Sequence, residues 1–214
     1  MSSQEIPTTR QERRKERTRT SLLDATRALM GRRGLDAITI ADIAAEADVG
    51  VGTFYNHFAT KEEIVQRAAD REFGRADLIV GDAVVGEQDP AVRLALGVLV
   101  SLRELEPNLL WAGVASRSRE DREEQRPLLN SPLVVRLLGD LAEGYESGSF
   151  DVAPQIGGFL VVGCVNSSLM SRAAGILRPE DDSLVAIAAL RALGVTTAQA
   201  RKATTKARTL LGRE

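Results

Sequence analysis

Residues 39–58 of this 214-residue chain predict two short helices joined by a tight turn. Thr39 and Asp42 have the spacing of a capping box, in which the threonine hydroxyl accepts from the amide three residues on and the carboxylate reaches back to the cap. A helix is therefore expected to begin near Ile40. Val49 and Gly50 are expected to end it, because glycine tolerates the left-handed conformation.

A second capping box at residues 60–63 predicts that another helix opens soon afterwards, which leaves about two turns for a helix starting near Val51. Such a short helix is not stable alone, so its apolar side, with Val51, Phe54 and Phe58, is expected to pack on its neighbours. The other face offers small or hydrogen-bonding groups that can approach base edges and phosphates: Gly50, Gly52, Thr53, Tyr55, Asn56 and His57. This pattern favours a helix-turn-helix that reads DNA; the alternative is a hydrophobic three-helix unit with a polar surface.

The segment in front of this motif is strongly basic. Residues 10–33 contain nine arginines and lysines against three acidic residues, whereas the whole chain has a formal charge of −2. A charge run is often only a solvated face, but one that directly precedes a helix-turn-helix is better explained by phosphate contacts and counterion release. The arginines before Thr18, Arg13 and Arg17 among them, are expected either to reach an adjacent minor groove or to remain disordered.

Residues 13–70 closely resemble the TetR family of transcriptional regulators. The resemblance rests on an apolar first helix, the stretch from Gly34 to Thr39, Ile43-Ala44, the run Gly52-Thr53-Phe54-Tyr55-Asn56-His57-Phe58, and Lys61-Glu62. It implies an all-α fold with an N-terminal three-helix DNA-binding head and a larger helical domain for ligand binding and dimerisation. The expected divisions are a flexible arm at 1–12, the helix-turn-helix head at 13–60 and the effector-binding and dimerisation domain at 61–214.

Carried over residue by residue, the resemblance implies the DNA contacts. Thr39 and Lys61 would each reach a phosphate, and Tyr55 and His57 would hold the backbone. Val51, Gly52 and Thr53 would face the major groove, with Asn56 beside them. His57 is the only histidine, and its neighbourhood offers no partners for catalysis or metal binding.

After residue 73 the sequence alternates helical runs with breaks at proline or glycine, which predicts further helices at about 61–85, 90–105, 107–117, 132–147, 154–174, 180–193 and 198–211. The chain has no 18-residue uninterrupted apolar run and no apolar secretory region near its start, so a cytoplasmic protein without a membrane partner is expected. Cys164 is the single cysteine and is interpreted as a small buried apolar residue.

The helix at 154–174 is rich in small residues that permit close helix packing, and in the TetR-like interpretation it pairs with its copy in a second subunit. An ordinary buried helix is the alternative. The residues expected in the dimer interface are Gly157, Gly158, Val161, Val165, Leu184, Ile187 and Leu190. An apolar effector cavity is expected from Arg103, Leu110, Trp111, Val114, Tyr145, Phe159, Asn166 and Met170, each of which could instead be ordinary core.

The resemblance to the TetR family implies a repressor that is released by a small molecule, and the single short recognition helix favours a homodimer on a near-palindromic double-stranded operator. No cofactor or metal is expected, and an enzyme is disfavoured because the sequence has no catalytic motif or metal-ligand cluster. The main alternative is an architectural DNA-binding protein that needs no effector, which would bind many sites with little preference.

Overall fold

The computed structural model describes residues 9–34, 36–105 and 131–212, and these form helices without a strand. The N-terminal helices are α1 (Arg10–Arg33), α2 (Ile40–Glu46), α3 (Val51–Tyr55) and α4 (Lys61–Ala83). They are followed by α5 (Pro90–Glu104), α7 (Pro132–Glu146), α8 (Pro154–Ala173), the 3₁₀ turn η1 (Pro179–Asp181), α9 (Asp182–Ala192) and α10 (Thr197–Leu211). The prediction of an all-α fold is confirmed; the helix expected at 107–117 lies outside the described residues.

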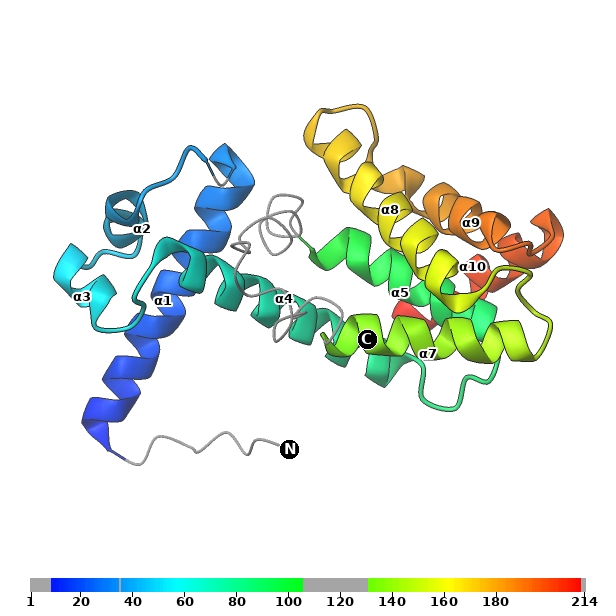
Figure 1. The fold of residues 1–214 in the computed structure, drawn as a ribbon, viewed down its shortest axis with the longest axis horizontal. Helices are drawn as coiled ribbons and strands as arrows, with labels where there is room; N and C mark the ends of the chain where they lie inside the picture. The colour runs from blue at the N-terminus through cyan, green and yellow to red at the C-terminus, as the bar shows by residue number, and fades with distance from the viewer. Residues whose placement is uncertain (1–8, 35, 106–130, 213–214) are drawn as a thin grey trace.

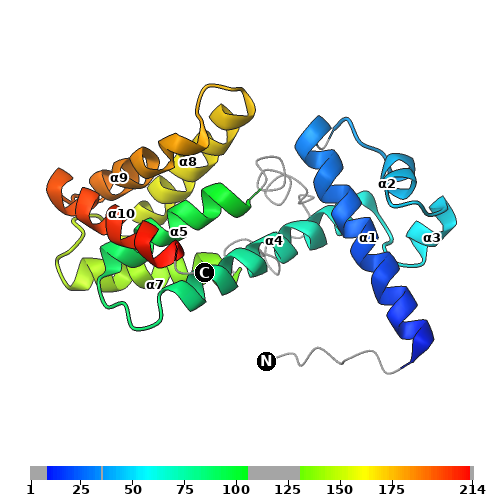
Figure 2. The same ribbon diagram turned by 180° about the vertical axis from the view of Figure 1, so that it is seen from behind.

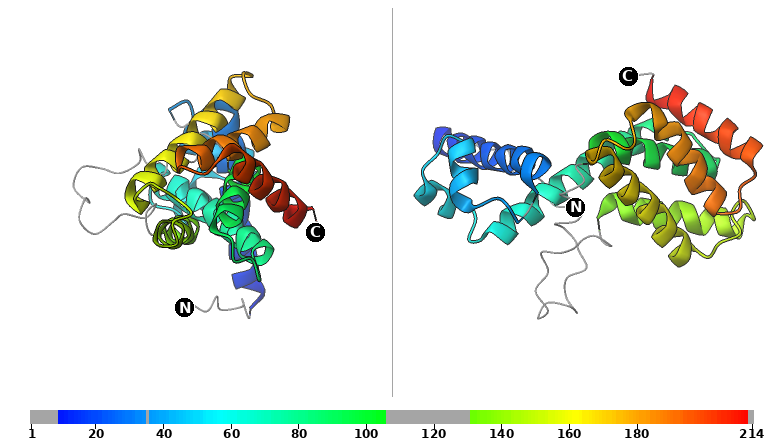
Figure 3. Two further views of the ribbon diagram at one scale, coloured as in Figure 1. Left: turned by 90° about the vertical axis from the view of Figure 1, so that its right-hand side faces the viewer. Right: turned by 90° about the horizontal axis from the view of Figure 1, so that it is seen from above.

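The chain forms two lobes joined by α4 (Figures 1 and 3). The head consists of α1, α2, α3 and the first turns of α4, and its buried core includes Leu22, Phe54 and Phe58. The body is built around α5, which α4, α7, α8, α9 and α10 all contact. The two hydrophobic cores meet within α4 between Ala68 and Ala69, later than the boundary expected at residue 60.

Capping interactions explain where the head helices begin. Thr39 and Asp42 form the predicted capping box, with the Asp42 amide donating to Thr39 Oγ1 at 3.1 Å and the Thr39 amide donating to Asp42 Oδ2 at 2.8 Å. Thr60 caps α4 as expected, because its hydroxyl accepts a hydrogen bond from the Glu63 amide. The Glu63 carboxylate, however, accepts from the amide of Ala59 and not from that of Thr60, so the capping box is not completed. Hydrogen bonds of this kind join residues only three or four positions apart, so they can be predicted from the sequence.

Two local predictions in the head were wrong. The turn after α2 places Asp48 in the left-handed conformation with φ 55°, whereas Gly50 has φ −72° and serves as the N-cap of α3. Aspartate adopts this conformation more readily than most residues because its side chain hydrogen-bonds locally. The expected arm also ends early, because a capping box between Thr9 and Glu12 starts α1 at Arg10.

The small residues of α8 serve packing within this chain, in which α8 contacts both α7 and α9. Figure 2 shows α8 running alongside α9. A methyl group on Gly157 would lie 3.0 Å from Leu141 and 3.1 Å from Leu193, and one on Gly158 would lie 3.1 Å from Leu138. Val161, Val165 and Leu190 are likewise buried in the body core. These five predicted interface residues therefore face inward, which corrects the prediction; the interface, if it uses α8, must use the opposite face.

Candidate nucleic-acid interface and core cavity

The short helix α3 sits on the head with its aromatic residues inward and its polar side free. Phe54 and Phe58 are fully buried, with ring centroids 5.9 Å apart. Val51 is 43% exposed and Tyr55 is 55% exposed, so the expected packing of Val51 is wrong, whereas its place on the outward surface agrees with a groove-facing role. Gly52 is exposed with no heavy atom near the position of a Cβ, which leaves room for another backbone to approach.

A second edge of this surface comes from α1. The Arg19 guanidinium lies 4.6 Å from the centre of the Phe58 ring, and its Nη1 donates to the His57 carbonyl at 3.4 Å. Burial, followed by the positive charges of Lys15 and Arg19, lowers the pKa of His57 below its usual range. His57 is therefore neutral at neutral pH and offers one ring N–H as a donor, as a phosphate contact requires.

The basic residues of α1 divide into two groups. Arg27, Arg32 and Arg33 form ion pairs inside the chain with Glu72, Glu46 and Asp42. Arg13 and Arg17 are exposed on the first turns of α1, together with Arg10, Arg14 and Lys15, and take part in none of the ion pairs among the described residues. Since residues 10–17 are helical, the alternative of disorder is wrong for them. The positive surface available to phosphates is the N-terminal part of α1.

Thr39 and Lys61 come together at a third edge of the head. The Lys61 Nζ donates to the carbonyl of Ile38 at 3.2 Å, directly before Thr39. Hydrogen bonds from Thr39 lower the pKa of Asp42, which is therefore ionised here, and Arg33 lies 3.3 Å from it. Thr39, at the N-cap of α2, and Lys61, at the start of α4, therefore lie near each other. His57 follows α3, Asn56 is exposed at the C-cap of α3, and Thr53 is half-buried.

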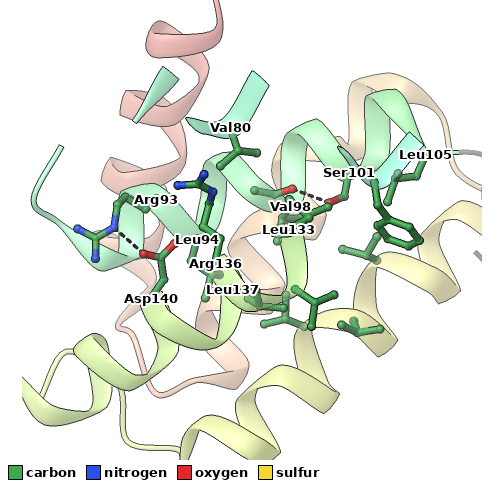
Figure 4. A pocket seen from close by; sticks show the side chains of 16 residues that line it. Val80, Arg93, Leu94, Val98, Ser101, Leu105, Leu133, Arg136, Leu137 and Asp140 are labelled. Atoms are coloured by element: carbon green, nitrogen blue, oxygen red, sulfur yellow. Dashed lines mark hydrogen bonds and ion pairs between the residues drawn. The ribbon is translucent and has the colours of Figure 1, made fainter. Parts of the chain in front are cut away.

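The body contains an apolar cavity of about 70 Å³ between α4, α5, α7 and α8. Most of its lining is apolar, and its polar side chains are Arg93 and Ser101 on α5 and Arg136 and Asp140 on α7 (Figure 4). Arg93 Nε donates to Asp140 Oδ1 at 2.7 Å, and Arg136 Nε donates to Asp77 Oδ1 at 2.7 Å. Burial raises the pKa of Asp140, against the opposing effect of Arg93.

The five predicted cavity residues that fall in the described ranges do not line this cavity. Tyr145, Phe159 and Met170 are 48%, 81% and 40% exposed, and Arg103 is exposed and paired with Glu104. Asn166 is half-buried on α8, with an Oδ1 that has no partner among the described residues. Leu110, Trp111 and Val114 lie outside the described residues. The helices in the described ranges were predicted correctly, but aromatic content was a poor guide to which helix faces enclose the cavity.

The sequence did contain a signal for the true lining. Arg93 interrupts an otherwise apolar helix, and Arg136 and Asp140 stand four residues apart in another. Charged residues spaced by four on an apolar helix share one face and must find partners when that face is buried. Their partners, however, are 47 and 59 positions away, which no local pattern reveals.

Comparison with known proteins agrees with this architecture. The family model described as bacterial regulatory proteins, tetR family, matches residues 22–68, which span most of the head. The repressor KstR2 of Mycobacterium tuberculosis is 47% identical over 174 residues, covering 65% of this chain and 86% of that protein. The chain belongs to the TetR family.

Other TetR-family relatives match in part or in fold. The repressor KstR of M. tuberculosis is 33% identical over 100 residues, and the aligned region spans 46% of its length; for the KstR of Mycolicibacterium smegmatis it spans 56%. The crystal structure of RolR in complex with resorcinol is 27% identical with a TM-score of 0.62, and the match covers 90% of this chain and 95% of RolR.

The roles predicted for two head residues, base reading by Thr53 and phosphate binding by Lys61, can be tested separately. Replacing Lys61 with alanine is expected to weaken binding to all DNA sequences and to lower the salt slope of the binding constant by about one, because the phosphate contact predicted for Lys61 would be lost. Replacing Thr53 with serine or asparagine is expected to change which bases are preferred. Binding titrations at several salt concentrations measure the first effect, and selection from random DNA measures the second; equal losses on every sequence for Thr53 variants would contradict its role.

Proposed function

We propose that this chain is a cytoplasmic transcriptional repressor that binds a near-palindromic operator as a homodimer and leaves it when a small molecule occupies the body cavity. The observation that supports this most is the combination of two units: a head whose α3 has an outward polar face beside the basic start of α1, and a separately packed body with its own cavity. The named repressors among its relatives and the ligand-bound RolR structure support the same function.

A second copy of the chain is the proposed partner of α8. Five apolar side chains of α8 are exposed: Ile156, Phe159, Leu160, Val162 and Met170. Leu184 of the neighbouring α9 is 60% exposed. By length and composition α8 could also cross a membrane, but it contains Asn166 and Arg172, and Arg172 donates to the Leu102 carbonyl of the body at 2.7 Å. Pairing with a symmetric copy would bury this face and set two recognition helices at a fixed spacing.

A chain of ion pairs joins the head to the wall of the cavity. Arg27 of α1 lies 3.4 Å from Glu72 of α4, and Glu72 lies 3.3 Å from Arg75. Arg75 then lies 2.7 Å from Glu104 at the end of α5, next to Leu105 in the cavity lining. Since Glu72 also precedes the cavity residue Phe73, a shift of α4 or α5 on ligand binding would be transmitted to α1. The cavity and the DNA-binding surface are coupled only if the ligand binds one position of these helices more tightly than the other.

Replacing Glu104 with glutamine is therefore expected to weaken this coupling. Operator affinity without ligand and ligand affinity without operator should change less than about threefold, because Glu104 contacts neither site, whereas the ligand-induced loss of operator affinity should shrink by about fivefold or more, within the usual range of coupling energies. Titrations of the operator with and without ligand measure the ligand-induced loss of operator affinity. Glu146→Gln, at an exposed position of α7, is the matched control; an undiminished response in Glu104→Gln would contradict the role of the ion pairs.

The function itself is tested by mapping the sites that the purified full-length protein selects from genomic DNA at physiological ionic strength. A repressor should select one or a few near-palindromic sites with half-sites about 34–36 Å apart, or a multiple of that distance. Binding to many unrelated sites with little preference would instead indicate the architectural alternative. A monomer with no preference over random competitor would overturn the proposal.

A further inference from the structure

The body cavity has a charged end whose charges are already balanced. Figure 4 shows Arg93, Arg136 and Asp140 gathered at one end, with Ser101 and Leu105 at the other. Arg93 pairs with Asp140 and Glu143, and Arg136 pairs with Asp77. The two positive charges are therefore outnumbered by three carboxylates, so the site holds no surplus positive charge for an anionic ligand.

Arg93 has little left to offer a ligand. Its Nε donates to Asp140 at 2.7 Å, its Nη2 to Glu143 at 2.5 Å, and its Nη1 to the carbonyls of Glu87 and Gln88 at 3.2 and 3.0 Å. All three nitrogens are thus engaged, and the side chain is only 11% exposed. Arg93 holds Asp140 in place and is a positioning residue.

Asp140 and Arg136 remain able to bind a ligand. In the described structure Asp140 uses Oδ1 for Arg93, and its second oxygen accepts no hydrogen bond. Arg136 uses Nε for Asp77, and its terminal NH groups donate no hydrogen bond within the same described ranges. The two residues are four apart on α7 and line the same cavity, so an acceptor and a donor stand side by side on one helix face.

We propose that this pair recognises a neutral hydroxyl group on a small, otherwise apolar ring, that is, an alcohol or a phenol. Asp140 accepts a hydrogen bond from the hydroxyl, and Arg136 donates one to the hydroxyl oxygen. A carboxylate ligand would instead meet the free oxygen of Asp140 and be repelled, whereas a hydrocarbon would leave both groups unsatisfied in an apolar surrounding. This inference rests on the proposed function in one respect: the cavity that binds the hydroxyl compound is the cavity proposed to control DNA binding.

The size of the cavity agrees with a small ligand. Its volume of about 70 Å³ is roughly half of the ~150 Å³ that holds benzene in an engineered protein cavity, so a single ring requires the walls to move slightly. A long acyl chain would require a far larger change. A ligand that widens the cavity between α4, α5 and α7 would bind more tightly to a conformation in which these helices are further apart. Such a preference for one conformation is what coupling to the head requires.

Calorimetric titration of the full-length protein with phenol, benzoate and toluene tests the proposal, because these three share a ring and differ in the polar group. Phenol is expected to bind about tenfold more tightly than toluene, which corresponds to one or two net hydrogen bonds, and benzoate more weakly still. Preference for benzoate, or equal affinity for phenol and toluene, would overturn the proposal.

Substitution of the pair should alter this order of preference. Asp140→Asn removes the negative charge that would repel a carboxylate ligand and also the charged acceptor for a hydroxyl, so benzoate affinity should rise and phenol affinity should fall, each by about fivefold to tenfold. Because Asp140→Asn also removes a partner of Arg93 and could impair folding, Arg136→Gln at a more exposed position is the second variant, for which phenol affinity should fall about tenfold. Glu146→Gln on the exposed side of α7 makes the same charge change outside the cavity and should leave the order unchanged.

The outcomes separate this inference from the proposed function. If phenol binds with the expected preference but never releases the operator, the hydroxyl site stands and regulation through this cavity fails. If only carboxylates or acyl compounds bind and release the operator, regulation stands and the hydroxyl site fails. An unchanged order of affinities in both Asp140→Asn and Arg136→Gln would also refute the roles given to these side chains.

Discussion

Replacing Phe54 with alanine is expected to abolish operator binding while the body stays folded. Phe54 is fully buried in the head core, where the removal of a phenylalanine ring costs about 3–5 kcal/mol. A head of this size has a stability of only a few kcal/mol, and a helix of five residues does not persist without its packing. The body has a separate core, so its helices should survive.

Circular dichroism, hydrogen exchange and operator titration measure these effects together. We expect fast exchange in α1, α2 and α3, protected amides in α5, α8 and α9, and a loss of operator affinity of more than about 100-fold, which corresponds to about 2.7 kcal/mol. Tyr55→Ala is the control, because the 55% exposed Tyr55 can lose a DNA contact without unfolding the head. Retention of operator affinity in Phe54→Ala would mean that α3 is not the recognition helix.

The head was largely predictable because its determinants are local. Thr39 and Asp42 are three residues apart, as are Thr60 and Glu63, and each pair forms hydrogen bonds that start a helix. The left-handed residue was misplaced because both Asp48 and Gly50 can adopt that conformation, and the choice between them depends on how α3 packs on its neighbours.

The faces of the body helices were harder to predict because these helices are apolar on more than one side. In α8 the buried Val161 and Val165 and the exposed Phe159 and Val162 are alike in hydrophobicity, so periodicity cannot tell the inner face from the outer one. The glycines gave a misleading signal, since close approach is required by Leu138 and Leu141 of the same chain. The orientation of the charged side chains depends on partners far away in the sequence, such as Asp140 for Arg93, and no local sequence pattern reveals these partners.

The outer face of α8 provides the second large expected effect: Phe159→Arg should convert the protein to a monomer and lower operator affinity by about 100- to 10,000-fold. Phe159 is 81% exposed in the single chain, so an arginine there should cost the fold little. In a symmetric pair the same change would bury two like charges at one interface. The drop in operator affinity follows because two linked heads bind as a unit, and that advantage disappears when each head binds alone.

Sedimentation and operator titration of three variants decide which face of α8 pairs. Leu78→Arg makes a similar change on the exposed side of α4, where the side chain is 68% exposed, and should remain dimeric with full affinity. Val161→Arg should unfold the body instead of merely separating subunits, because Val161 is only 3% exposed within the chain. A Phe159→Arg protein that remains dimeric would exclude the outer face of α8 as the contact between copies, and the spacing of the two recognition helices would then have to be set by another surface of the body.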